Sequence, residues 1–372
     1  MAKTEIKDVK PGEDLLVVEA LSQHFGRLKA VDKVSFTLKK GEVFGLVGES
    51  GCGKTTTGRS IIKLYDITSG NVYFKGVRIG AGTLSYKENI KSKKAETAAK
   101  IAALRVSGDT DKIAEIKADA ASYIAEQKKL MKEARRANKH VPRDLVTKIQ
   151  MIFQDPVASL NPRMTVKEIV SEGLVINGER DKKVIEEKVY GILEKVGLVR
   201  EHAGRYPHEF SGGQKQRIGI ARSVIMEPEV IIADEPVSAL DVSIQAQVIN
   251  LLNELREDLG LTILFIAHDL SVVKYFSDRI GVMYFGKMVE LASSDELFAH
   301  PMHPYTRSLL SAIPLPDPRY EKERQRISYV PLRDHDYSVD GPTFREVTPG
   351  HFVLCNNEEE ERYRREAMGD EA

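Results

Sequence analysis

The 372-residue chain contains little cysteine, no long apolar run and no excess of either charge. Its two cysteines, Cys52 and Cys355, stand far apart in the sequence, which argues against a disulfide framework. Apolar runs such as Thr262 to Ala267 have the length of a strand, well short of the roughly 20 residues that span a bilayer as a helix. The first 14 residues are polar and charged, so we expect no secretory signal.

The charge balance argues against one class of function. Lysine plus arginine number 55, and aspartate plus glutamate also number 55, so the formal net charge is zero. Dedicated nucleic-acid binders usually carry a clear basic excess, and we therefore expect no nucleic-acid partner. Hydrophobic residues make up 42% of the chain, enough for the core of one large domain or two ordinary ones. Together these features predict a soluble, cytosolic, globular protein.

Short apolar runs alternate with helical stretches, a pattern typical of an α/β fold with a mostly parallel sheet. We expect strands at 15–19, 34–38, 43–47, 149–153, 230–233 and 261–266. Two further apolar runs, 280–285 and 288–291, flank Gly286-Lys287 and predict a β-hairpin.

Two regions depart from this pattern. Segment 81–148 is rich in alanine, lysine and glutamate, and Gly108-Asp109 interrupts it, so it predicts two helices, about 86–106 and 111–138, folded as an antiparallel hairpin. Residues 91–140 hold 13 basic and 7 acidic side chains, which fits either a solvated surface or a partner-binding one.

A linker is predicted by three prolines, Pro314, Pro316 and Pro318. The segment after it, 319–372, has little periodicity and predicts a partly exposed tail.

The run from Gly48 to Thr55 matches the phosphate-loop pattern G-x-x-x-x-G-K-[ST] without a mismatch. A strand is expected before it and a helix, 55–64, after it. Glycines let several backbone N–H groups converge on one anion. We expect Lys54 to contact the β- and γ-phosphates of a nucleotide and Thr55 to bind Mg²⁺. The alternative is a glycine-rich turn at a helix start. The remaining nucleotide contacts are expected from Gly48, Ser50, Gly51, Cys52, Gly53 and Thr56; Cys52 occupies a free position of the motif, and we assign it no redox role.

Two carboxylates, Asp234 and Glu235, follow the expected strand 230–233. Successive side chains of a strand point in opposite directions, so one carboxylate can hold a metal while the other faces a water. We assign Asp234 to Mg²⁺ and Glu235 to general-base or water-orienting work. Taken alone, capping of the next element explains the pair equally well; the phosphate loop upstream favours the catalytic interpretation.

Ser211-Gly212-Gly213-Gln214 stands about 20 residues before this strand end, and here the chain resembles an ATP-binding cassette (ABC) protein. Further motifs of that family match in order. They are Phe25 as the aromatic stacked on adenine, Gln154 as the Q-loop glutamine of the Mg²⁺ site, Ser238 to Asp241 as the D-loop, and His268 as the switch histidine that reaches the γ-phosphate.

The resemblance implies an α/β P-loop NTPase of the ABC type, with a RecA-like core, an antiparallel β subdomain and an α-helical signature subdomain. It also implies a head-to-tail dimer in which Ser211, Gly213 and Gln214 meet the ATP bound on the other cassette. The D-loop residue Asp241 would be a further nucleotide-binding residue. Ser211 also has the residue type of a helix N-cap. Lys54, Glu235 and His268 would be the catalytic residues, with ATP and Mg²⁺ as cofactors.

A narrower set of motifs resembles the oligopeptide/dipeptide importer subfamily. These motifs are 153–156, 159–163, 241–247, 303–306 and 309–314. The nucleotide-binding domain would then cover 14–318, with the helical hairpin inserted within 81–148, and 319–372 would be a C-terminal extension. Two features depart from the subfamily: the hairpin is additional, and Cys355 alone cannot build a four-cysteine iron–sulfur cluster.

The resemblance implies an ATPase that energises a peptide importer from the cytoplasmic face of the membrane. Its partners would be a second, related cassette, two permease subunits and an external solute-binding protein. Import of nickel or an oligosaccharide, and an ABC ATPase acting on DNA or ribosomes, remain alternatives. A cassette does not touch the transported solute, so its residues carry little information about it.

Overall fold

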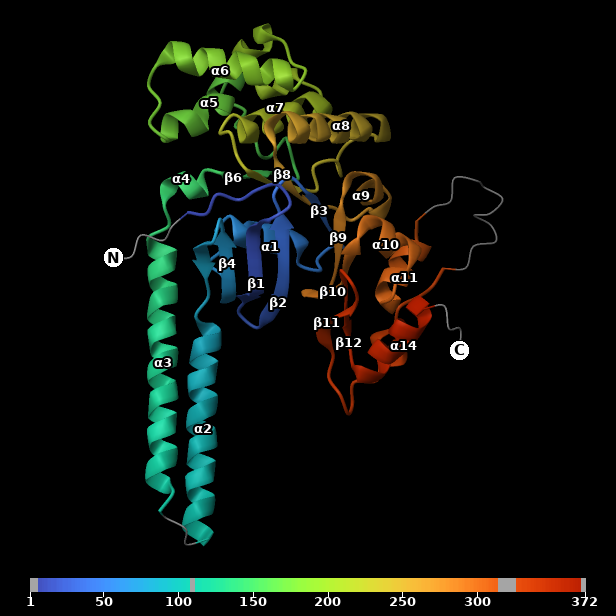
Figure 1. Cartoon of the computed structure of the whole chain (residues 1–372). Coiled ribbons are helices and arrows are strands. Elements are labelled where there is room, and N and C mark those ends of the chain that lie inside the picture. Colours follow the sequence, from blue (N-terminus) through green and yellow to red (C-terminus); the bar gives the residue numbers. More distant parts are fainter. Residues whose placement is uncertain (1–5, 108–110, 314–325, 369–372) are drawn as a thin grey trace.

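The computed structural model describes residues 6–107, 111–313 and 326–368, which build two sheets and a separate helical layer (Figure 1). The strands are β1 (Asp14–Phe25), β2 (Leu28–Lys39), β3 (Val43–Val47), β4 (Ser69–Phe74), β5 (Val77–Ala81), β6 (Ile149–Ile152), β7 (Val230–Asp234), β8 (Thr262–Ile266), β9 (Arg279–Tyr284), β10 (Lys287–Ser293), β11 (Thr343–Thr348) and β12 (His351–Cys355). The helices are α1 (Lys54–Ile61), α2 (Leu84–Ser107), α3 (Ile113–Lys139), α4 (Arg143–Val146), α5 (Val166–Ile176), α6 (Lys182–Lys195), α7 (Gly212–Val224), α8 (Val242–Leu259), α9 (Leu270–Phe276), α10 (Ser294–Ala299), α11 (Pro304–Ser311), α13 (Pro331–Asp334) and α14 (Asn357–Met368), with short 3₁₀ turns at Arg200–Gly204 and Pro207–Glu209.

The larger sheet has the strand order β11-β12-β10-β9-β3-β8-β7-β6. Its central strands β9, β3, β8, β7 and β6 pair in parallel, which confirms the prediction of a mostly parallel sheet. Every residue of β3, β7 and β8 is buried, because helices cover a parallel sheet on both faces and its strands become continuously apolar. Parallel strands also end at the same edge of the sheet, and the phosphate loop and Glu235 both follow such strand ends.

The smaller sheet is antiparallel, with the order β2-β1-β4-β5, and it is the antiparallel β subdomain implied by the family resemblance. It shares one hydrophobic cluster with the parallel core, and Phe36 of β2 stacks on Phe44 of β3 with ring centroids 5.1 Å apart. Sequence analysis did not predict β4 and β5, since their few apolar residues are interrupted by Gly70, Asn71 and Lys75.

Helices α5, α6 and α7 form the separate layer at the top of Figure 1. The sequence starts these helices with strong local signals. Thr165 and Glu168 form a reciprocal capping box at α5, and the Asp181 side chain accepts a hydrogen bond from the Lys183 amide at α6. Their apolar faces pack into the same cluster as β7, β8 and α8, which fixes this layer to the core.

The predicted helical hairpin is confirmed as α2 and α3, which project from the small sheet (Figure 1). The buried positions of α3, Ala120, Gln127 and Ala134, recur every seven residues, the spacing of a coiled-coil seam. At the base, the Asn138 side chain accepts a hydrogen bond from the Ala81 N–H at 2.8 Å and donates one to the Ala81 carbonyl at 2.7 Å. This pairing anchors α3 to the edge strand β5. The predicted break at Gly108-Asp109 lies outside the described residues.

The expected partly exposed tail, 319–372, is described over residues 326–368, here called the C-terminal extension; many of its residues are exposed, but it folds into strands and a helix. Strands β11 and β12 extend the large sheet through β10, and α14 buries Tyr363 against Met302, Val347, Val353 and Cys355. The register of the β10–β12 pair and this small core are long-range features that local periodicity does not reveal. The proline linker at 314–318 lies outside the described residues. Within the described ranges, no helix combines the length and the low charge that a bilayer crossing needs.

Candidate nucleotide site

The phosphate loop joins β3 to α1 in a conformation that requires glycine at two positions. Gly48 has φ 147°, and a Cβ there would lie 2.2 Å from the Met283 carbonyl oxygen. Gly53 has φ 106°, and a Cβ there would lie 2.4 Å from the Ala30 carbonyl oxygen. Both distances are far inside van der Waals contact, and φ values in this range strain any other residue. The loop ends at Gly53, and α1 begins at the next residue. The free N–H groups at a helix N-terminus favour an anion.

Lys54 is buried, and its ammonium group is held inside the loop. Nζ donates to the carbonyl oxygens of Gly48 at 2.7 Å and Glu49 at 2.9 Å. Burial raises the pKa of the Cys52 thiol, whose Sγ lies 3.8 Å from Lys54 Nζ. A neutral thiol is a poor nucleophile, and this agrees with a Cys52 that has no redox role. Ser50 and Gly51 are exposed, whereas Thr55 and Thr56 are half-buried in the first turn of α1.

The Asp234 side chain is fully buried at the end of β7 and has one unsatisfied oxygen. Oδ1 accepts a hydrogen bond from Thr55 Oγ1 at 2.7 Å, whereas Oδ2 has no hydrogen-bond partner among the described residues. The Arg59 guanidinium lies 3.7 Å from Oδ2. Burial raises the pKa of Asp234, because burial penalises the charged carboxylate more than Thr55 and Arg59 stabilise it. A buried carboxylate with a free oxygen beside a hydroxyl is a donor set that suits Mg²⁺, which prefers oxygen ligands.

Three side chains from the ends of neighbouring parallel strands meet at Glu235. Gln154, after β6, donates from Nε2 to Glu235 Oε2 at 3.0 Å, and His268 Nδ1, after β8, lies 3.2 Å from the same oxygen. Glu235 itself has φ 44°, an uncommon conformation for a non-glycine residue that often marks a functional position. A pocket of about 60 Å³ borders Glu235 and His268. Gln154 therefore contacts the expected general base here rather than the expected metal ligands Thr55 and Asp234.

The signature residues lie on a different layer from the phosphate loop. Ser211 is the N-cap of α7 and forms a capping box with Gln214: the Ser211 N–H donates to Gln214 Oε1 at 3.0 Å, and the Gln214 N–H donates to Ser211 Oγ at 3.4 Å. Figure 1 shows α7 in the helical layer, apart from α1. Gly213 lies in the first turn of α7, and Asp241 is the exposed N-cap of α8. The chain thus separates these expected nucleotide contacts from its own phosphate loop.

The expected adenine-stacking residue Phe25 ends β1 with 44% of its surface exposed. Its ring meets the ring of Tyr65 edge to face, with centroids 5.2 Å apart. Sequence analysis missed Tyr65 and Arg59, since neither belongs to a motif. It also missed the Tyr305 hydroxyl, which accepts a hydrogen bond from the Glu49 N–H at 3.0 Å. Tyr305 stood within a subfamily motif, but nothing local links it to a loop so distant in the sequence.

Two models of known protein families match the sequence of this chain. The model described as "ABC transporter" matches residues 31–104 and 116–238. The model described as "Oligopeptide/dipeptide transporter, C-terminal region" matches residues 289–346, which include most of β10 and the first part of β11. The first match covers the phosphate loop, the signature and both strand-end carboxylates.

Several curated proteins are similar along nearly their full length. The oligopeptide transport ATP-binding protein OppF of Bacillus subtilis is 54% identical, over 93% of this chain and 98% of that protein. OppF of Streptococcus mutans is 48% identical, over 91% and 92%, and the dipeptide transport ATP-binding protein DppF of Lactococcus lactis is 45% identical, over 92% of both chains.

Solved structures of cassettes share the fold. The cbiO1 protein of Clostridium perfringens, part of an ABC transporter complex, superposes with a TM-score of 0.55 at 25% identity and covers 77% of this chain and 92% of its own. A dimeric post-hydrolysis cassette bound to ADP and phosphate superposes with a TM-score of 0.53 at 23% identity and covers 75% of this chain and 99% of its own.

Proposed function

Because the chain belongs to the ABC transporter ATPase family, we propose that it is the ATP-hydrolysing subunit of an importer of oligopeptides or dipeptides. The observation that carries the proposal is the convergence of Gln154 and His268 on Glu235, next to the phosphate loop. The peptide substrate is supported by the names of the similar proteins and by the match of the C-terminal region. Nickel and oligosaccharides are the alternative cargoes.

In the proposed mechanism, the triphosphate enters the loop between β3 and α1, where backbone N–H groups and Lys54 balance its charge. Glu235 Oε2 would accept a proton from water as the water oxygen bonds to the γ-phosphorus; the bond from the γ-phosphorus to the β–γ bridging oxygen would break, and ADP would leave with that oxygen. The hydrogen bond that Gln154 donates to Oε2 fixes the Glu235 carboxylate at the strand end. His268, beside the same oxygen, is placed to contact the γ-phosphate. Phe25 would stack on the adenine.

Mg²⁺ would be held by Thr55 and Asp234, with Gln154 as a further expected ligand. When bound, it neutralises charge on the β- and γ-phosphate oxygens. The unsatisfied Asp234 Oδ2 supports this assignment.

An Asp234→Asn variant should lose most of the effect of magnesium, because the amide keeps the shape of the carboxylate but loses its charge. In the wild type, we expect ATP to bind more tightly in the presence of Mg²⁺ than in the presence of EDTA. In the variant, the affinities for ATP under these two conditions should agree within about twofold. Turnover of the variant should fall about a hundredfold. Titration of a fluorescent ATP analogue measures the binding difference. The control is Asp278→Asn; Asp278 Oδ2 accepts a hydrogen bond from the N–H of Val43, at the opposite end of β3 from the loop. An unchanged magnesium effect in Asp234→Asn would remove Asp234 from the metal site.

We also propose that a second cassette completes the nucleotide site. Ser211, Gly213 and Gln214 lie on α7, away from their own phosphate loop (Figure 1), so a head-to-tail partner would bring them to the γ-phosphate. Asp241 would lie at the same interface. The remaining proposed partners are two permease subunits and an external solute-binding protein, with this chain on the cytoplasmic face of the membrane.

The proposal is tested with the complete transporter, assembled from this chain and its membrane and binding-protein partners in lipid vesicles. We expect MgATP-dependent accumulation of a labelled peptide, and no accumulation of nickel or an oligosaccharide under the same conditions. Uptake of nickel or oligosaccharide alone would reassign the cargo. Absence of MgATP binding and hydrolysis by the complete complex would overturn the ATPase function.

A further inference from the structure

The start of the phosphate loop is tied to a residue far along the chain. The backbone N–H of Glu49, the second residue of the loop, donates to the Tyr305 hydroxyl at 3.0 Å across 256 sequence positions. Gly48 precedes it with φ 147°, so this is the point at which the loop turns away from β3. A hydrogen bond here fixes the direction in which the following amides point.

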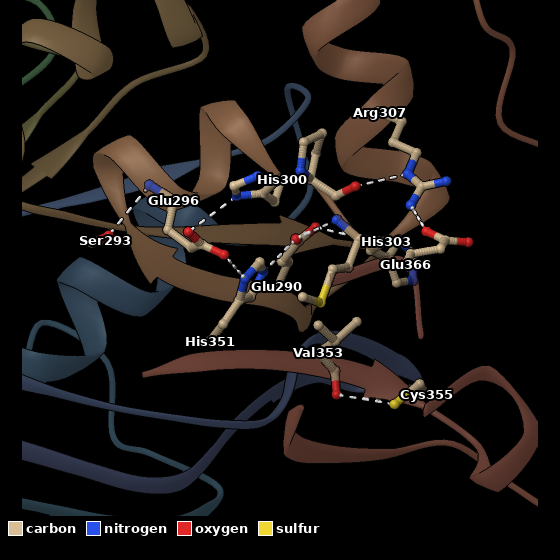
Figure 2. A network of polar contacts seen from close by, with 12 residues as sticks. Glu290, Ser293, Glu296, His300, His303, Arg307, His351, Val353, Cys355 and Glu366 are labelled. Carbon is tan, nitrogen blue, oxygen red and sulfur yellow. Dashed lines mark hydrogen bonds and ion pairs between the residues drawn. The ribbon is translucent and has the colours of Figure 1, made fainter. Parts of the chain in front are cut away.

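The backbone of Tyr305 is itself held by a buried polar network. The carboxylate of Glu290 on β10 accepts hydrogen bonds from the Met302 N–H at 2.8 Å and the His303 N–H at 3.0 Å, and His351 Nε2 on β12 lies 2.7 Å from it (Figure 2). His303 then caps α11: its Nδ1 accepts the Tyr305 N–H at 3.1 Å. Burial lowers the pKa of His303 to about 3, so its ring is neutral and Nδ1 is free to accept. This network places Tyr305 at the start of α11.

Neighbouring rings fix the direction of the Tyr305 side chain. Its ring centroid lies 4.4 Å from that of Tyr284, at the end of β9, and 5.5 Å from that of Tyr329 in the C-terminal extension. The residue is only 2% exposed. Burial also raises the pKa of its hydroxyl, which therefore stays protonated. Tyr305 thus presents one neutral oxygen to one backbone amide.

A second contact from the same part of the chain holds the loop further along. The Gly286 N–H, in the turn between β9 and β10, donates to the Cys52 carbonyl at 2.9 Å. The loop is therefore fixed at Glu49 and at Cys52 by residues that lie outside the nucleotide motifs. Between these points lie Ser50 and Gly51, in the stretch whose amides are expected to face the phosphates.

We propose that Tyr305 is a positioning residue for the phosphate loop, through which α11 and the C-terminal extension hold the loop in the shape that binds triphosphate. The inference rests on the proposed ATPase function. Donors that are already aligned lose less conformational freedom on binding, so loosening the Glu49 amide should weaken nucleotide binding. Loop amides contact the nucleotide in the ground state and in the transition state alike, and the loss should appear in KM more than in kcat.

The test is a Tyr305→Phe variant of the full chain in its assembled transporter, compared with Tyr329→Phe. Both substitutions remove one hydroxyl from the same ring cluster, but of these two hydroxyls only that of Tyr305 is hydrogen-bonded to the loop within the described part of the chain. For Tyr305→Phe we expect the KM for ATP to rise about three- to tenfold, with kcat within about twofold of wild type. In the chain without nucleotide, the amides of residues 49–54 should exchange hydrogen faster. Tyr329→Phe should match wild type in both measurements.

Two results would overturn the inference. One is a Tyr305→Phe variant with unchanged KM and unchanged loop exchange, which would make Tyr305 a packing residue only. The other is an equal rise of KM in Tyr329→Phe, which would assign the effect to the ring cluster as a whole. Failure of the proposed function itself is distinct, since wild type would then neither bind nor hydrolyse MgATP.

Discussion

A Glu235→Gln variant of the assembled transporter is expected to bind MgATP yet to hydrolyse it about two to four orders of magnitude more slowly. The amide cannot accept a proton from water, whereas its size lets Gln154 and His268 keep their places around it. Because hydrolysis would normally release the ATP-bound cassette pair, the variant should also accumulate as a closed dimer. Single-turnover hydrolysis measures the first effect, and retention of labelled ATP by the transporter after removal of free nucleotide measures the second.

The control is Glu187→Gln, the same chemical change at an exposed position of α6; it should keep wild-type turnover. A Glu235→Gln variant with turnover within about threefold of wild type would show that another group accepts the proton. Loss of MgATP binding in that variant would instead place Glu235 in nucleotide binding. Both outcomes contradict the assigned role.

A Glu290→Ala variant is expected to destabilise the attachment of the C-terminal extension by about 3–5 kcal/mol. Glu290 is fully buried and is the shared acceptor for the Met302 amide, the His303 amide and the His351 ring (Figure 2). Removal leaves three buried donors unpaired, the two amides and the His351 ring, at a cost of about 1–3 kcal/mol for each unsatisfied group, so about 3–5 kcal/mol is the lower part of their sum. Amides of β12 should then exchange hydrogen about two to four orders of magnitude faster.

Glu296→Ala is the matched control for this prediction. Glu296 lies near the same His351 ring, with Oε1 3.5 Å from Nδ1, but its side chain is 37% exposed. Ion pairs at such positions contribute about 0–1 kcal/mol, so exchange in β12 should change by less than about fivefold. Equal exchange rates in Glu290→Ala and wild type would show that the network does not hold the extension.

The nucleotide site was largely predictable because its chemistry needs short motifs. The phosphate loop consists of glycines and one lysine within eight positions. The two expected catalytic carboxylates, Asp234 and Glu235, are adjacent in the sequence. The structure brings Lys54 to the loop carbonyls, Thr55 to Asp234, and Gln154 and His268 to Glu235. Ser211 has a structural role as well, since its side chain caps the N-terminus of α7. Roles in catalysis and metal binding stay predictions for the variants above to test.

The C-terminal extension was not predictable in the same way. Strand β11 is only partly buried, and α14 shows four consecutive glutamates before its buried Tyr363, so neither segment displays a clear apolar period. The extension is held in place because β12 pairs with β10 and because His351 contacts the buried Glu290, 61 positions away in the sequence. Composition alone therefore indicated a partly exposed tail and not its strands and helix.

By itself, the sequence determined the phosphate loop, the strand ends that carry Asp234, Glu235 and His268, the signature start of α7 and the helical hairpin, because each depends on residues that are neighbours in the chain. The tertiary structure decided which of these groups meet. It placed Gln154 on Glu235, separated Ser211 from its own phosphate loop, and set Tyr305 against the Glu49 amide. The physical reason is that such contacts depend on strand order and on the packing of elements far apart in the sequence. Short sequence motifs predict neither.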